Sequence, residues 1–252
     1  MKQNYTEQEF KEILSKIEPR AGWDFSRMNT ISETAPWDYV EVVKQHLKPT
    51  DKVLDIGTGG GERFTQLAQY FRSGIGIDVD PVMVKTANEN TSTVANLSFI
   101  YSDEDIQELP HDFDVILNRH APFSLEAVKE HLKGDGQFIT QQVGEQNMLN
   151  VKKALNLPIV QPPIDRVMLS ANGLKIIDFR EYNIEYIVKD IESLVFWLNA
   201  LDMLHADIEG SAALKDVDTL NRVLRGNVTE RGFVTNEQRY LAIAQKSANK
   251  KK

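Results

Sequence analysis

The pattern of apolar and polar residues alternates between strand and helix periods through the middle of the chain. Short apolar runs of strand type are separated by helical patterns of roughly ten residues. The predicted strands are KVLDI (52–56), GIGID (74–78), LSFIYS (97–102), FDVILN (113–118) and GQFITQQV (136–143). The predicted helices between them are ERFTQLAQYF (62–71), PVMVKTANEN (81–90) and SLEAVKEHL (124–132). Strands that alternate with helices form βαβ units, so this pattern predicts a parallel sheet covered by helices on both faces.

The start of the chain has a purely helical pattern. Thr6 stands three residues before Glu9, which is the spacing of a helix capping box, and an apolar helical stripe follows. A second helix is predicted from residue 36 or 37 to about residue 47, where Pro49 ends it. We therefore expect two N-terminal helices before the first predicted strand.

The C-terminal third holds two long strand-like segments, 174–188 and 232–246, which we expect to pair antiparallel. Two helical patterns lie between them, in residues 189–229. The first of these, IESLVFWLNALDML, places most of its apolar residues on one stripe, with Phe196 and Trp197 off that stripe. Something else must therefore cover these two rings.

Composition narrows the class of protein. The 252 residues suit one sizeable α/β domain with a small addition. We expect a cytoplasmic protein with no membrane contact, because neither a signal peptide nor a membrane-spanning run is seen. The formal net charge of −8 argues against a nucleic-acid partner. The chain has no cysteine and no two histidines at metal-ligand spacing, so we predict no disulfide, no thiol chemistry and no metal.

A glycine-rich stretch, VLDIGTGGGERF (53–64), follows the first predicted parallel strand and precedes a helix. One or two glycines are enough for a tight turn, so the additional ones indicate a ligand that lies against the backbone. A Walker phosphate loop is excluded because Glu62 and Arg63, rather than Lys and Ser or Thr, follow Gly61. The dinucleotide fingerprint also fails, because it requires glycine at position 62.

Asp55, two residues before the first glycine, indicates the charge of that ligand. Its carboxylate would repel a pyrophosphate by about 1 kcal/mol at 4 Å even in water. The same carboxylate would attract an ammonium or sulfonium group. S-adenosylmethionine carries both groups and no phosphate, and it is therefore the ligand that we predict.

Two further acidic positions fit the same ligand. Asp78 ends the next strand 21 residues after Gly57, where an open α/β sheet places a carboxylate on a ribose diol. The alternative for Asp78 is a helix N-cap before Pro81, although Asp80 is better placed for that role. Asp105 lies in an acidic loop after the third strand, and it suits an adenine amino group, with an exposed acidic turn as the alternative.

The succession VLDIGTGGGE, GIDVDPVM, SDEDIQELP, FDVILN and LKGDGQFITQQV resembles the class I S-adenosylmethionine-dependent methyltransferases over residues 50–145. The resemblance implies an α/β fold, a Rossmann-like three-layer sandwich. Its sheet has seven mostly parallel strands with the last antiparallel, and here it carries N-terminal helices and a helical insert before the last strand. The cofactor-binding positions that it implies are Asp55, Gly57, Thr58, Gly59, Gly61, Asp78, Val79, Met83, Glu104, Asp105, Ile106 and Asn118.

The segment NRHAPF (118–123) departs from the Asn-Pro-Pro-Tyr motif of amino-methylating enzymes, so adenine and glutamine amides are not the expected targets. His120 in this segment is the candidate base. In-line positioning can carry most of a methyl transfer, so a dedicated base need not exist. The candidate substrate-contacting residues are Arg27, Trp37, Arg119 and Trp197.

We predict one domain over residues 1–252, built from four parts. These parts are a helical lid (1–49), a cofactor-binding core (50–188 and 230–246), a helical cap insert (189–229) and a disordered tail (247–252). Two parts have simpler alternatives. The loop 22–39 is either a lid or a loop packed on the domain, and the insert is either a cap or a segment covered by its own second helix or by a dimer partner.

The predicted function is methyl transfer from S-adenosylmethionine to a small-molecule acceptor by a monomer or homodimer. The alternatives are an RNA or protein methyltransferase, and a Rossmann-like protein that binds a nucleoside without catalysis.

Overall fold

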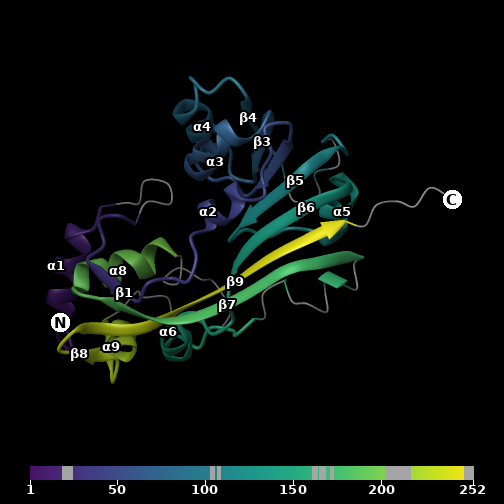
Figure 1. Ribbon diagram of the computed structural model, residues 1–252. Coiled ribbons are helices and arrows are strands. Elements are labelled where there is room, and N and C mark those ends of the chain that lie inside the picture. The colour runs from purple at the N-terminus through teal and green to yellow at the C-terminus, as the bar shows by residue number, and fades with distance from the viewer. Residues whose placement is uncertain are drawn as a thin grey trace. The chain divides into compact units, whose positions relative to one another are not determined.

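The computed structural model describes residues 1–18, 25–102, 106, 109–160, 164, 169–170, 173–201 and 217–246 (Figure 1). The chain divides into two compact units. The glycine-loop unit comprises Pro36–Val143, Pro162–Glu181 and Arg239–Lys252, and the helical unit comprises Met1–Ala35, Gly144–Gln161 and Tyr182–Gln238. The predicted division into lid, core and cap stays a prediction, and residues 202–216 and 247–252 of the cap and tail lie outside the described residues.

A mostly parallel sheet forms the centre of the glycine-loop unit. Its parallel strands are β2 (Lys52–Ile56), β3 (Ser73–Asp78), β4 (Leu97–Tyr101), β5 (Phe113–Arg119) and β6 (Leu132–Val143), in the order β4-β3-β2-β5-β6. The strand β9 (Gly232–Lys246) then pairs antiparallel with β6, and β7 (Leu174–Val188) lies beyond it. The order of strands reverses between β2 and β5, which is where open α/β sheets bind ligands.

Helices cover both faces of this sheet. Successive residues of a strand point to opposite faces, so a strand that is apolar throughout needs a covering layer on each side. The helices of this unit are α2 (Tyr39–Lys44), α3 (Glu62–Leu67), the 3₁₀ helix η1 (Ala68–Tyr70), α4 (Pro81–Asn90) and α5 (Leu125–His131). Val53 belongs to the apolar cluster beneath α2, α3 and α4, whereas its neighbour Leu54 belongs to the cluster that contains α5. The predicted three-layer α/β sandwich is therefore confirmed.

The helical unit has an apolar core of its own, to which each of its longer elements contributes. Its helices are α1 (Glu7–Lys16), α6 (Leu149–Ala154), α8 (Ile191–Ala200) and α9 (Val217–Leu224). The capping box predicted at the start of α1 is present, since Thr6 Oγ1 accepts from Glu9 N and the Glu9 carboxylate accepts from Thr6 N. The short α6 was not predicted.

The predicted count of seven strands is wrong by two. Among the described residues the sheet has nine strands, because β1 (Thr30–Ser32) pairs with β7 and β8 (Val228–Thr229) pairs with β9. Strands of two or three residues are too short to show a period of two in the sequence. These two strands are recognised only by their pairing with β7 and β9 in the structure.

Two predicted helices also differ in extent. The second helix is shorter than predicted and begins at Tyr39, because the Asp38 carboxylate accepts from Glu41 N as its N-cap. The helix predicted over 62–71 ends at Leu67 and continues as η1. No helix in the part of the chain that the structure describes is long and apolar enough to cross a membrane.

Candidate active site

The glycine-rich loop joins the carboxyl end of β2 to the start of α3. Gly57, Gly59 and Gly61 all have positive φ angles, of 75°, 58° and 77°. At Gly57 an added Cβ would lie 2.1 Å from the Ala121 Cβ, so this glycine also allows the loop after β5 to pack directly on the glycine-rich loop. The turn itself therefore requires these three glycines, and their presence alone does not indicate a ligand.

Polar groups at this loop give the stronger indication. The Asp55 carboxyl is half-buried, and its burial raises the pKa to about 6 against the opposing effect of the nearby Thr58 hydroxyl. Asp78 raises the pKa of Asp55 further, and Arg119 lowers it. The Thr58 hydroxyl is buried and forms no hydrogen bond of normal geometry among the described residues. A buried hydroxyl without a well-aligned hydrogen bond is costly, and a neighbouring carboxylate attracts positive charge, so this corner of the loop suits a polar, cationic ligand.

Asp78, at the carboxyl end of β3, faces the same loop. Its Oδ2 accepts from Gly59 N at 2.8 Å, and its Oδ1 accepts from Asp80 N at 3.0 Å. Each carboxylate oxygen can accept a further bond, so the half-buried group remains able to receive two hydroxyl donors. The N-cap of α4 is Asp80, whose carboxylate accepts from Val82 N at 2.8 Å, so the alternative role for Asp78 is excluded.

Some of the remaining predicted cofactor-binding residues lie in the described part of the chain and others do not. Val79 is 63% exposed, Met83 is half-buried, and Ile106 is buried with a φ of 42°. Glu104 and Asp105 lie outside the described residues. The predicted adenine contact of this loop therefore stays a prediction.

Asn118 is fully buried at the end of β5 and acts as a junction between three strands. Its Nδ2 donates to Ile56 O at 3.1 Å and to Ala121 O at 3.2 Å. Its Oδ1 accepts from Thr140 Oγ1 at 3.0 Å and also from Gln142 Nε2. These bonds use the whole capacity of the amide, so the side chain fixes the strand ends, and its predicted contact with a cofactor stays a prediction.

His120 follows in the loop after β5, with a φ of 59°. Its backbone N donates to Gln141 O at 2.9 Å, and its ring Nε2 lies 3.1 Å from Gln141 Nε2. Gln141 Oε1 in turn accepts from Trp37 Nε1 at 2.8 Å. Burial holds the pKa of His120 well below its usual value, and the charges of Arg119 and two further arginines lower it again. The predicted site residues Trp37, Arg119 and His120 thus lie together.

Two residues of this site did not appear among the sequence candidates. Gln141 lies beside Arg119 in the register of β5 and β6. Tyr39 is buried, and its hydroxyl lies 3.3 Å from both Asn118 O and Ile139 O. Burial raises the pKa of Tyr39 far above its usual range, so the phenol stays neutral. The position of Gln141 at the carboxyl end of a parallel strand was the signal that could have identified it.

The other two substrate candidates, Arg27 and Trp197, belong to the helical unit. The Arg27 guanidinium lies 3.7 Å from the centre of the Phe196 ring and donates to Glu18 O at 2.5 Å. The half-buried Trp197 ring lies 5.1 Å from the ring of Tyr186. Residues of the same unit thus contact both rings of α8 that fall off the apolar stripe, and the substrate roles stay predictions.

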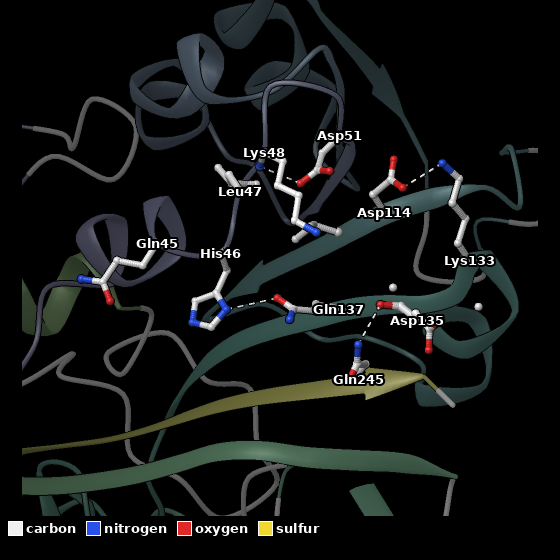
Figure 2. A pocket seen from close by; sticks show the side chains of 13 residues that line it. Gln45, His46, Leu47, Lys48, Asp51, Asp114, Lys133, Asp135, Gln137 and Gln245 are labelled. Atoms are coloured by element: carbon white, nitrogen blue, oxygen red, sulfur yellow. Dashed lines mark hydrogen bonds and ion pairs between the residues drawn. The ribbon is translucent and has the colours of Figure 1, made fainter. Parts of the chain in front are cut away.

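A separate hollow of about 400 Å³ opens at the amino ends of β2, β5 and β6 (Figure 2). Polar groups of its wall bind one another, since Lys133 Nζ lies 2.8 Å from Asp114 Oδ1 and His46 Nδ1 lies 3.1 Å from Gln137 Oε1 (Figure 2). Ligands of parallel sheets bind at the carboxyl ends of the strands. This hollow is at the other end of the sheet and is not the site of the predicted cofactor. Among the described residues, no group of three His, Asp or Glu side chains is arranged to hold a metal ion.

Comparison with known proteins assigns the glycine-rich loop and the strands around it to a known domain family. The model of a methyltransferase domain family matches residues 47–162. A probable ribosomal RNA small subunit methyltransferase A of Methanosarcina barkeri is 34% identical over 86 residues, which are 34% of this chain and 29% of that protein. A ribosomal protein L11 methyltransferase of Caldicellulosiruptor bescii is 29% identical over 120 residues, covering 46% of this chain and 40% of that protein. A trans-aconitate 2-methyltransferase of Deinococcus radiodurans is 32% identical over 101 residues, covering 37% and 38%. The chain thus spans well under half of the length of these relatives.

Solved structures agree on the fold. The YcgJ protein of Bacillus subtilis superposes with a TM-score of 0.61 at 18% identity, over 84% of this chain and 99% of that one. A putative methyltransferase of Bacillus halodurans gives a TM-score of 0.58 at 15% identity, over 83% and 99%. Residues 47–162 therefore carry a methyltransferase domain, and the fold is that of the class I, S-adenosylmethionine-dependent methyltransferases. The resemblance stated from the sequence is confirmed, with the subfamily unspecified.

Proposed function

We propose that this chain binds S-adenosylmethionine at the glycine-rich loop and transfers its methyl group to a small-molecule acceptor. The observation that carries the proposal is the corner formed by Asp55 and Thr58. A half-buried carboxyl with a raised pKa stands there beside a buried hydroxyl, and the two do not form a hydrogen bond of normal geometry. A ligand ammonium with neighbouring polar groups would satisfy both.

Two described carboxyl groups support cofactor binding at the glycine-rich loop, and the adenine contact is a further part of the proposal. Asp55 would hold the ammonium of the cofactor, Asp78 would accept from its ribose hydroxyls, and the segment around Ile106 would receive its adenine. When bound, S-adenosylmethionine supplies a methyl group on a sulfonium, which is an activated leaving group. The chain itself has to bind the two substrates, orient them and exclude water. Rigid strand ends, such as the one that Asn118 fixes, would hold the substrates in place.

The small-molecule acceptor is supported by two features of this chain. Its net charge of −8 disfavours a nucleic-acid acceptor, and NRHAPF replaces the motif typical of amino-methylating enzymes. One relative is named for a small carboxylic acid, trans-aconitate. Location in the cytoplasm and a monomeric or homodimeric state remain part of the proposal.

Transfer to ribosomal RNA or to a ribosomal protein is the second candidate, because two relatives are named for these acceptors. The test is a set of transfer reactions with methyl-labelled S-adenosylmethionine and three acceptor pools, namely small metabolites, ribosomal RNA and ribosomal proteins. The Asp78→Ala variant is the control for cofactor-dependent label. Label in the metabolite pool alone is expected, and label in RNA or protein alone would contradict the small-molecule proposal.

A further inference from the structure

Trp37 fixes the orientation of the Gln141 amide. The indole Nε1–H can only donate, so the atom of Gln141 that lies 2.8 Å from it must be the amide oxygen. The NH₂ group of Gln141 therefore lies on the opposite side, 3.1 Å from His120 Nε2. The two hydrogen bonds thus determine which side of the Gln141 amide carries the oxygen and which carries the nitrogen.

Gln141 in turn fixes the tautomer of His120. An NH₂ group can only donate, so His120 Nε2 must accept and carries no proton. A neutral imidazole then has its proton on Nδ1, which has no hydrogen-bond partner among the described residues. His120 is thus arranged to donate from Nδ1 and has no nitrogen left to accept a proton from a substrate.

The electrostatic surroundings of His120 point the same way. Arg119, Arg239 and Arg63 all act on the ring, and together with burial they disfavour its protonation. Arg119 also interacts with the carboxyl of Asp55 and with the phenol of Tyr39, and the phenol is neutral. Three arginine side chains thus add positive charge around His120 in a chain whose net charge is −8.

His120 also lies next to the glycine-rich loop. Its neighbour Ala121 packs on Gly57, so closely that an added Cβ on Gly57 would lie 2.1 Å from the Ala121 Cβ. A neutral hydrogen-bond donor with arginines around it is thus placed beside the loop that is proposed to hold the cofactor. These are the features of a site for an anionic oxygen group.

We infer that the acceptor is a small carboxylate, held by His120 Nδ1–H and the surrounding arginines and methylated on one of its own oxygens. The inference rests on the proposed function. One carboxylate oxygen accepts from Nδ1–H, while the other supplies the electron pair of the new O–CH₃ bond. The electrons of the broken S–CH₃ bond stay on sulfur, so a carboxylate and a sulfonium become a neutral ester and a neutral thioether. No proton moves, which agrees with a histidine that cannot act as a base.

The first test reads the tautomer directly, by ¹⁵N–¹H NMR of the imidazole in the full chain between pH 5 and 8. A proton on Nδ1 and a bare Nε2 across this range are expected. The Gln141→Glu variant should move the proton to Nε2, because a carboxylate can only accept from the ring. A wild-type ring protonated at Nε2, or one that titrates near pH 6.5, would overturn the inference.

The second test compares two substitutions of His120 that place an amide at different ring positions. His120→Asn carries its NH₂ close to the position of Nδ1 and tolerates the positive φ, whereas His120→Gln carries it close to Nε2. With succinate, citrate and benzoate as probes, and succinamide and benzamide as neutral controls, His120→Asn should keep carboxylate binding within a few fold. His120→Gln and Gln141→Glu should lose at least about tenfold, with unchanged S-adenosylmethionine affinity. Equal binding of acids and amides by the wild type would count against the inference.

The third test identifies the bond that is formed. Product from a metabolite extract and methyl-labelled cofactor is treated with alkali, which releases volatile labelled methanol from methyl esters but not from methylated amines or ethers. Release of the label is expected. Alkali-stable product would overturn the carboxylate acceptor and leave the proposed function intact, whereas the absence of any labelled product would defeat the proposed function and this inference with it.

Discussion

At the scale of single residues, the predicted chemistry depends on two carboxyl groups with different environments. Asp55 is half-buried with a raised pKa, while Asp78 is bonded to the backbone of the loop and of its own strand end. The first suits a cationic group and the second suits hydroxyl donors. Each role leads to a separate prediction.

The affinity for S-adenosylmethionine should depend on pH through Asp55. The pKa of this group is raised from 3.8 to about 6, so the folded protein binds its proton more tightly than the unfolded chain does. The unliganded protein should therefore lose stability as pH rises from about 4 to 6, whereas a cationic ligand should bind more tightly over the same interval. Calorimetry should show full affinity above pH 7 and weaker affinity below pH 6. Asp55→Asn should bind weakly with little pH dependence, and an unchanged pH profile in this variant would refute the role of Asp55.

Replacing Asp78 with alanine should weaken S-adenosylmethionine binding by about 1.5–3 kcal/mol, the usual scale for hydrogen bonds to a charged group. The matched control is Asp80→Ala, two residues away, which removes the N-cap of α4. That variant should lose about 1 kcal/mol of stability and keep its cofactor affinity. Equal losses of affinity in the two variants would mean that Asp78 acts only through the fold.

At the scale of elements, the carboxyl ends of β2, β5 and β6 are held in register by one buried amide, Asn118. The sequence predicted these strands, because they show period-two or continuous apolar runs, and the location of the site at their carboxyl ends stays a prediction. It did not predict the chain from Trp37 through Gln141 to His120, whose partners are 104 and 21 residues apart. Side-chain pairing over such separations leaves no local pattern. The two strands β1 and β8 were missed because they are too short to show a period of two.

Asn118→Ala should lower the free energy of unfolding by about 2–4 kcal/mol, because it leaves several buried partners without a hydrogen bond. Asn88→Ala is the matched control, since the exposed Asn88 amide donates to the backbone of α4 and β4. Its cost should be below about 1 kcal/mol. Urea denaturation measures both variants, and similar costs would contradict the assignment of Asn118 as the junction of the three strands.

At the scale of the whole molecule, a methyltransferase domain covers residues 47–162, and a separate helical unit has its own apolar core. The sequence predicted the longer elements of both regions and missed α6, β1 and β8. It did not predict that the chain would divide into these units, because β7 and β9 are continuous in sequence and each runs through both. Long strands with one unbroken pattern give no sign of such a boundary.

Trp197 tests what the helical unit contributes. Its ring lies against Tyr186 and the apolar core of the unit, so Trp197→Ala should cost about 1–4 kcal/mol of stability with unchanged S-adenosylmethionine affinity. Urea denaturation and calorimetry measure these two quantities. A raised Michaelis constant for the acceptor, in addition, would support the predicted cap. Unchanged stability would contradict the packing role.

Titration calorimetry of the full chain shows whether the glycine-rich loop binds S-adenosylmethionine, as proposed, or a pyrophosphate cofactor. Wild-type protein at pH 7.5 is titrated with S-adenosylmethionine, S-adenosylhomocysteine and NAD, and the same series is repeated with Asp55→Asn. Binding of both adenosyl compounds, no binding of NAD, and a loss of at least about tenfold for S-adenosylmethionine in the variant are expected. Binding of NAD by the wild type without binding of S-adenosylmethionine would contradict the proposed cofactor.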